Sequence, residues 1–330
     1  MMNWRNVLLL GALITALPWL TLAQARAQES YPSRPIRLVI PSVPGGVHDV
    51  IGRLWAERVK AILGTIVIDN RGGGGGVIGA NDVAHSLPDG YSILLGSTST
   101  QALSPAAMAQ PPYDPMMSFT GVSVFSFSST SIVVNPTVPV HSLKELIAYA
   151  KANPGKLSYG SAGNGSITNM AGELFKRLGG GLDIVHIPYK GIGQGVTDLI
   201  SGIIPMFSAN ATAQILDLAR AGKVRILAVN AAERIKAAPE IPTSNEAGLT
   251  GMVAQTTFAI FAPVGTPAAI VARLDAATQK VMADEDFQKQ LLKLGFEPVR
   301  GVGGEKATEV FRDELVRWTP ILKAGGVKAE

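Results

Sequence analysis

Two glycine-rich loops carry the residue types from which proteins build small anion-binding sites. One is Pro41–Asp49 (PSVPGGVHD) and the other is Tyr159–Thr168 (YGSAGNGSIT), and each leads from a strand-like run into a helix-like segment. The first amides of a helix lack intrahelical partners and the helix dipole adds partial positive charge, which favours an anion by about 0.3–1 kcal/mol when exposed and by up to ~2 kcal/mol when partly buried. Neither loop contains Lys or Arg, so directional N–H and O–H donors would read a planar carboxylate. Taken singly, each loop is also compatible with an ordinary turn and helix cap.

The candidate ligand-binding residues of the two loops lie close to the expected helix starts. They are Gly45, Gly46, Val47, His48, Asp49, Ser161, Asn164, Gly165, Ser166 and Thr168. For Asp49 two roles stay open: a first-turn acid that stabilises the helix, or a partner for an amine, amide or hydroxyl donor on the ligand. For His48 the sequence favours a solvent-exposed loop histidine over a ligand contact.

A third glycine-rich stretch, Arg71–Ala80, contains the spacing G-x-G-x-x-G from Gly74 to Gly79. A dinucleotide-binding loop of this kind needs an acidic residue roughly 20 positions further on, and no Asp or Glu stands between Asp89 and Asp114. The spacing G-x-x-x-x-G-K-[ST] is absent as well. The sequence therefore disfavours a nucleotide and implies no cofactor.

Catalytic and metal-binding motifs are missing from the sequence. It contains no H-E-x-x-H, no G-x-S-x-G, no S-x-x-K and no cysteine, and none of its histidines has metal-ligand spacing: they stand at His48, His85, His141 and His186. We expect a protein that is not an enzyme and binds no metal. A hydrolase whose Ser, His and Asp meet only in the folded chain is the alternative that a sequence leaves open.

The first residues predict export. Arg5 precedes the apolar run Val7–Leu22, which contains Pro18 and is followed by Ala25-Arg26-Ala27. This order is typical of a secretory signal peptide, and the run is too short for a membrane anchor. We predict a signal peptide over residues 1–27, cleavage near Ala27 and a periplasmic mature protein. Without cysteine the protein can be neither a lipid-anchored lipoprotein nor stabilised by disulfides.

Composition narrows the class of partner. The chain is 47% hydrophobic and 16% charged, which is typical of a globular domain large enough to bury its own core. The formal net charge of +4 falls to +2 when Arg5 and Arg26 leave with the signal peptide. With no basic stripe interleaved with aromatics and no basic amphipathic helix, we expect neither nucleic acid nor a membrane surface as a partner.

Strand-like and helix-like segments that could position the loops alternate along the chain. Strands are predicted at 36–40, 65–68, 92–95 and 131–134, and helices over 49–63, from the glycine run through 85, and over 142–152, where Ser142 and Glu145 form a capping box. Further strands are expected at 183–187, 203–207, 224–229 and 257–262. This alternation predicts an α/β fold with mostly parallel sheets.

The order and spacing of many short motifs extend this interpretation to a family. They include Tyr31-Pro32-Ser33-Arg34-Pro35-Ile36, Pro44-Gly45-Gly46 with Asp49, Asn70-Arg71 with the glycine run, Pro88-Asp89-Gly90-Tyr91, Asn153-Pro154-Gly155-Lys156-Leu157, His186-Ile187-Pro188-Tyr189-Lys190-Gly191 and Phe261-Ala262-Pro263. Over essentially the whole mature chain, the sequence resembles the receptor family of tripartite tricarboxylate transporters, the Bug-type extracytoplasmic solute-binding proteins.

This resemblance implies a two-lobed periplasmic-binding-protein (Venus-flytrap) fold with a ligand cleft between the lobes. Lobe 1 would comprise 28–130 and 259–330, and lobe 2 would comprise 131–258. The protein would capture a small carboxylate-bearing solute by lobe closure and deliver it, as a monomer, to the membrane subunits of a tripartite tricarboxylate-type transporter. A periplasmic sensor that hands the same liganded state to a signalling partner is the alternative.

The resemblance also bears on individual residues. It implies that the glycine run is a tight structural connection, and it adds candidate ligand contacts at Ser97, Thr98, Ser99, Tyr189, Lys190 and Asn210. Lys190 could either support its loop or supply charge to the ligand. His48 stands where the family commonly has a small residue, so the identity of the carboxylate stays open.

Overall fold

The computed structural model describes residues 31–325 and 327, so the predicted signal peptide and its cleavage near Ala27 lie outside the described residues. Contacts divide the chain into two units, Met1–Arg34 and Pro35–Glu330, and every helix and strand described below belongs to the second. Within residues 31–325 and 327, no helix is both long enough and apolar enough to cross a bilayer.

One hydrogen-bonded network of strands runs through the second unit. Its order is β2-β1-β3-β9-β4-β7-β5-β6, and β10 and β8 pair with β4 off this path. The strands are β1 (Ile36–Ile40), β2 (Ile66–Asn70), β3 (Ser92–Ser97), β4 (Phe119–Val134), β5 (Leu157–Ser161), β6 (Ile184–Pro188), β7 (Met206–Asn210), β8 (Arg225–Val229), β9 (Gln255–Pro263) and β10 (Glu297–Gly303).

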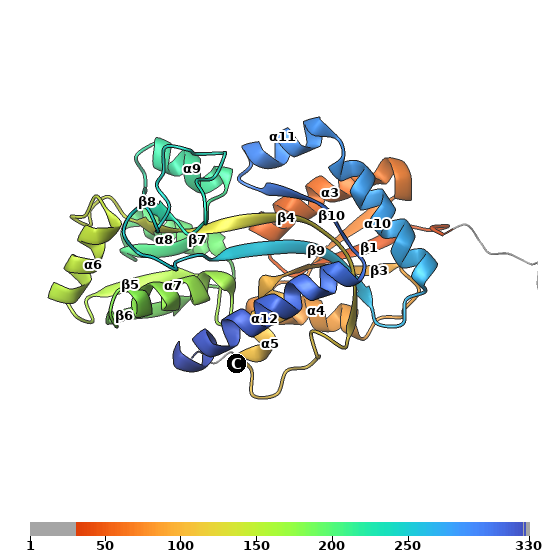
Figure 1. Ribbon diagram of the computed structural model, residues 1–330, viewed down its shortest axis with the longest axis horizontal. Helices are drawn as coiled ribbons and strands as arrows, with labels where there is room; N and C mark the ends of the chain where they lie inside the picture. Colours follow the sequence, from red (N-terminus) through yellow and green to blue (C-terminus); the bar gives the residue numbers. More distant parts are fainter. Residues whose placement is uncertain (1–30, 326, 328–330) are drawn as a thin grey trace, which may run out of the picture. The chain divides into compact units, whose positions relative to one another are not determined.

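Strands β4 and β9 connect two halves of this network (Figure 1). The first half contains β1, β2, β3 and β10, and the second half contains β5, β6, β7 and β8. β4 pairs with β9 along Phe119–Ser129 and with β7 along Thr130–Val134. The strand predicted at 131–134 is therefore only the end of a 16-residue strand. The earlier part of this strand is not predicted because buried serine and threonine residues interrupt the apolar run that indicates a strand.

The direction of the strands differs between the outer and the central pairs. The outer pairs β1–β2, β1–β3, β5–β6 and β5–β7 are parallel, as the alternation of strands and helices predicts. The pairs that β9 and β4 make with β3, β7, β8, β10 and each other are antiparallel, so the expectation of mostly parallel sheets is wrong for the centre. Two strands that pass in opposite directions between the halves cannot both run parallel to their neighbours.

Helices follow most of the parallel strands. They are α3 (Val47–Leu63), α4 (Val77–Ala84), α5 (Ser104–Ala106), α6 (Leu143–Ala152), α7 (Ile167–Leu178), α8 (Ile192–Ser201), α9 (Ala213–Arg220), α10 (Ala268–Met282), α11 (Glu285–Lys293) and α12 (Glu305–Gly325), with short turns η1 (Gly74–Gly76) and η2 (Ser99–Leu103). The predicted N-cap of α6 is confirmed, because Ser142 Oγ accepts from Glu145 N at 3.2 Å; Glu145 Oε2 accepts at 2.7 Å from His141 N, one residue before the N-cap.

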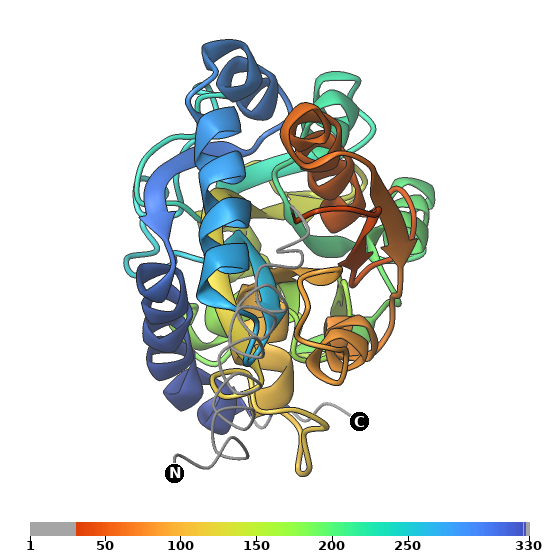
Figure 2. The ribbon, with the colours of Figure 1, turned by 90° about the vertical axis from the view of Figure 1, so that its right-hand side faces the viewer.

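Close packing holds the helix starts near the strand ends. A Cβ at Gly52 would lie 2.7 Å from Ile40 Cδ1, so the glycine lets α3 approach β1. Trp55 of α3 is buried and donates to Thr278 Oγ1 of α10 at 3.2 Å; Figure 2 shows α3 in orange and α10 in light blue. The last helix, α12, buries Trp318 in the same apolar cluster as Phe175 of α7, and it also packs on β4.

Candidate ligand-binding site

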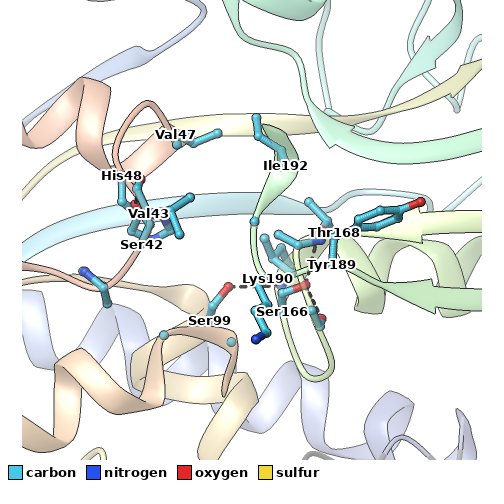
Figure 3. A pocket seen from close by; sticks show the side chains of 18 of the residues that line it. Ser42, Val43, Val47, His48, Ser99, Ser166, Thr168, Tyr189, Lys190 and Ile192 are labelled. Atoms are coloured by element: carbon cyan, nitrogen blue, oxygen red, sulfur yellow. Dashed lines mark hydrogen bonds between the residues drawn. The ribbon is translucent and has the colours of Figure 1, made fainter. Parts of the chain in front are cut away.

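A cavity of about 350 Å³ lies where β1, β5 and β6 end and their loops lead into helices. The carboxyl ends of parallel strands are the usual place for ligands in α/β folds. Its wall comes from the loop before α3, the glycine run Gly73–Gly76, the loop before α7 and the loop Pro188–Gly191 before α8 (Figure 3). Ser99, Asn210 and Thr256 complete the lining.

Three helix N-termini meet at this cavity. The N-cap residues of α3, α7 and α8 are Gly46, Ser166 and Gly191, and all three line it. Among the residues described, none accepts a hydrogen bond from the amides of Val47, His48, Thr168 or Ile192. These unpaired donors and the positive ends of three helix dipoles make the cavity favourable for an anion.

The charged residues around the cavity are few. Lys190 lines it and is exposed, and no carboxylate in the described part of the chain lies within 4.0 Å of its ammonium group. Tyr189 also lines the cavity, but its hydroxyl donates to Asp198 Oδ2 at 2.8 Å. No Asp or Glu stands in the described lining. The wall is therefore electropositive through backbone dipoles and one lysine.

Asp49 organises the first loop from behind. It is 4% exposed and lies outside the lining, and its carboxylate accepts from Gly45 N at 2.8 Å, Arg53 Nε at 2.8 Å and Asn70 Nδ2 at 2.9 Å. Burial raises the pKa of Asp49, but the hydrogen bonds from Arg53, Gly45 and Asn70 outweigh it and hold the pKa below its usual range. This placement matches the first-turn role and leaves the proposed pairing with a ligand donor without support.

The expectation for His48 is wrong. His48 is the second residue of α3 rather than part of an exposed loop, and its half-buried ring lines the cavity. The ring packs edge-on against Phe258 with centroids 5.1 Å apart. Burial lowers the pKa of His48 to about 4, so the imidazole is neutral at physiological pH.

Ser161 also differs from its expected place, because it faces the half-buried His186. Its Oγ lies 2.7 Å from His186 Nε2 and outside the cavity lining. Asn169 Oδ1 accepts from Gly165 N, which leaves its Nδ2 to approach His186 Nδ1 at 3.4 Å. The histidine proton then sits on Nε2 and is donated to Ser161, whereas a general base would accept the serine proton. The hydrogen bond of this Ser–His pair therefore runs in the opposite direction to that of a hydrolytic pair, and its role is structural.

The remaining candidates divide between lining and support. Gly46, Val47, Ser99, Asn164, Ser166, Thr168 and Asn210 line the cavity along with His48, Tyr189 and Lys190, whereas Gly45, Ser97, Thr98 and Gly165 do not. Thr98 Oγ1 accepts from Thr257 N at 3.0 Å. Ser99 Oγ accepts from Ile167 N at 3.1 Å, so it already occupies one amide of the α7 N-terminus.

The glycine run has a role that sequence analysis missed. Gly73, Gly74, Gly75 and Gly76 all have positive φ and all line the cavity, so the run is more than a structural connection. Ser104 Oγ, also missed, lies 3.0 Å from Gly75 O and 3.2 Å from Gly165 O, which belong to loops of opposite halves. The only sequence signal was the glycine run itself, whose spacing fails the requirements of a nucleotide-binding loop and which the family resemblance interprets as a structural connection.

Comparison with known proteins places this geometry in a family. The profile described as "Tripartite tricarboxylate transporter family receptor" matches residues 51–327. The chain belongs to this receptor family. Protein BugT of Bordetella pertussis is 34% identical to this receptor over 302 residues, which cover 91% of this chain and 92% of BugT.

Solved structures agree with the family. R. palustris Rpa4515 with adipate superposes on this receptor with a TM-score of 0.86 at 33% identity, covering 90% of this chain and 99% of that one. MatC (Rpa3494) from Rhodopseudomonas palustris with bound malate gives a TM-score of 0.83 at 29% identity, covering 88% and 100%. The receptor therefore has the α/β periplasmic-binding-protein fold, and it is a solute-binding protein rather than an enzyme.

Proposed function

We propose that this receptor captures a small carboxylate-bearing solute in the cavity and presents it to the membrane subunits of a tripartite tricarboxylate-type transporter. The observation that carries the proposal is the convergence of three helix N-termini, with unpaired amides at Val47, His48, Thr168 and Ile192, on one small cavity. A volume of about 350 Å³ suits a small solute. The relatives with adipate and malate bind carboxylates, which supports the same class here.

Capture proceeds by closure of two lobes, 28–130 with 259–330 and 131–258, about the crossing strands β4 and β9. Contacts across the cavity support a closed form: Ser99 Oγ meets Ile167 N, and a Cβ at Gly191 would lie 3.0 Å from Val43 Cγ2. Each loop alone offers a shallow site, and only the closed form engages both ends of a solute. Binding therefore shifts the population toward closure by differential affinity.

The receptor acts in the periplasm after cleavage of residues 1–27 near Ala27. The order of charged, apolar and small residues at the start of the chain supports this step. Intact mass of the exported protein tests it, since cleavage after Ala27 leaves Gln28 as the first residue. A protein that retains the apolar segment would contradict it.

Thermal unfolding of the purified receptor tests the ligand class. A panel of aliphatic and aromatic mono-, di- and tricarboxylates, amino acids and nicotinamide nucleotides is added one at a time. A ligand at 100 times its Kd stabilises the native state by about 2.7 kcal/mol, which raises Tm by several degrees. We expect the shift with a carboxylate, whereas a shift with nucleotides alone would overturn the proposal.

A further inference from the structure

Two side chains on the cavity wall carry polar atoms that the protein itself does not satisfy. Neither ring nitrogen of His48 has a hydrogen-bond partner among the described residues, and because Nε2 is buried from solvent, Nδ1 is the nitrogen that a solute can reach. A buried polar atom without a partner destabilises a protein, so a ligand group that pairs with the imidazole would be favoured. The neighbouring Ser42 hydroxyl donates to Val43 O at 3.2 Å. Of the His48 and Ser42 side chains, the imidazole is thus the one without a partner in the protein.

Asn210, at the end of β7, holds an unused acceptor. Its Nδ2 donates to Ser128 O at 3.1 Å and to Thr256 Oγ1 at 2.9 Å. Because a backbone carbonyl can only accept, the amide nitrogen must face Ser128, and Oδ1 is left on the other side. No described residue donates to Oδ1, although Asn210 is only 4% exposed and lines the cavity.

Strand β9 brings these two groups together. Thr256 bonds to Asn210, and Phe258 packs against His48. Residues two apart on a strand point to the same face, with a spacing of roughly 7 Å. His48 and Asn210 therefore lie above one face of the same short piece of strand. Thr256 accepts from Asn210 and keeps its own hydroxyl proton available as a donor.

The part of the cavity wall between His48 and Asn210 fits an uncharged ligand group better than a charged one. Nδ1 of a neutral imidazole either donates or accepts, depending on the tautomer, and Asn210 Oδ1 offers an acceptor. A carboxylate has only acceptors and would face the lone pairs of Oδ1. An ammonium group would find no carboxylate in the described lining, since Asp49 lies behind the wall and is already bonded to Arg53 and Asn70.

We propose that His48 and Asn210 are specificity-determining residues that bind an uncharged donor–acceptor group, a hydroxyl or a primary amide, on the carboxylate solute. This inference rests on the proposed function and narrows its substrate class. The carboxylate of the solute takes the helix amides, and the neutral group takes the imidazole and the amide oxygen.

The experiment compares ligands that share a carboxylate and differ in one other group. Kd is measured by calorimetry at pH 7.5 for butyrate, 2-, 3- and 4-hydroxybutyrate, succinamate, succinate and 4-aminobutyrate, and for the matching six-carbon compounds. We expect one hydroxyl or amide compound to bind at least about tenfold more tightly than its methyl, carboxylate and ammonium counterparts, as one or two net hydrogen bonds would give. Comparing the hydroxybutyrates with succinamate shows whether the neutral group is a hydroxyl or a primary amide.

Variants assign the preference to the two side chains. His48→Phe keeps the ring contact with Phe258 and removes both nitrogens, and Asn210→Leu removes the acceptor. We expect each to reduce the preference to about threefold or less, because the hydroxyl or amide compound loses more affinity than butyrate does, and we expect His48→Gln to retain part of the preference. His85→Phe is the matched control, because His85 is exposed and lies outside the lining. Thermal unfolding verifies that each variant is folded. If Asn210→Leu does not fold, the test rests on His48→Phe alone.

The outcomes separate this inference from the proposed function. Equal binding of all carboxylates, tightest binding of succinate or 4-aminobutyrate, or a preference that survives both substitutions would overturn the inference and leave carboxylate capture standing. Binding of no carboxylate in either series or in the thermal panel would overturn both.

Discussion

Replacing Gly75 with alanine tests whether the glycine run closes the cavity. Gly75 has φ +63, and a Cβ there would lie 2.5 Å from Ser104 Oγ and 2.9 Å from Asn164 O, which belongs to the opposite half. The left-handed conformation costs an alanine about 1–2 kcal/mol whether the cavity is open or closed. The contact with a backbone oxygen acts only in the closed form, where overpacking costs roughly 1–3 kcal/mol.

Gly74→Ala is the control for backbone strain. Gly74 has φ +57, but a Cβ there would meet only Val77 Cβ, at 3.6 Å. The Ser104 hydroxyl is the end of a side chain that can rotate away from the Cβ of Gly75→Ala, so both variants should lose similar free energy of unfolding without ligand. Only Gly75→Ala should weaken binding through the closed form, by about 5- to 150-fold in Kd for the carboxylate that gives the largest thermal shift.

Calorimetry and small-angle scattering give the readouts. Calorimetry supplies Kd for wild type and both variants, and scattering reports whether a saturating ligand still makes the protein more compact. Equal Kd values for Gly75→Ala and Gly74→Ala, within about twofold, would refute the reasoning that the run contacts the other half on closure.

Three further changes have defined outcomes. Burial is the main cause that lowers the pKa values of His48 and His186 to about 4. Between about pH 6.5 and 4 the unfolded chain therefore binds more protons than the native protein, and Tm should fall as pH drops through this window. The decrease of Tm over this pH range should be smaller in His48→Phe and His186→Phe than in the wild type. A pH profile of Tm that is the same in the variants would contradict the assignment to these two histidines. Asp49→Asn should lower the free energy of unfolding by about 1–3 kcal/mol in urea titrations and leave the ranking of ligands unaltered; a new ranking would restore its role as a ligand partner. Lys190→Gln should reduce the association rate of carboxylates about two- to fivefold at low salt and hardly at 1 M salt, measured by stopped flow; a loss independent of salt would argue against electrostatic steering.

Much of the site could be predicted from residues that are neighbours in the sequence. A glycine or hydroxyl residue before a helix leaves amides unpaired wherever the chain goes next, so the loops before α3 and α7 could be assigned from their residues alone. The N-cap of α6 is local in the same way, because Ser142 and Glu145 are three residues apart. The alternation of strands and helices likewise indicated an α/β fold.

Contacts between distant segments decided the rest. The sequence by itself determined where helix N-termini with free donors would stand, since a cap depends on residues within one turn. Only the tertiary structure turned Ser161 toward His186, bonded Asp49 to Asn70 and placed His48 over Phe258. The partners in these contacts are 21 to 210 residues apart, so no local pattern records them. The orientation of a side chain follows from which partner reaches it in three dimensions, and that partner also decides whether the side chain supports the wall or faces the solute.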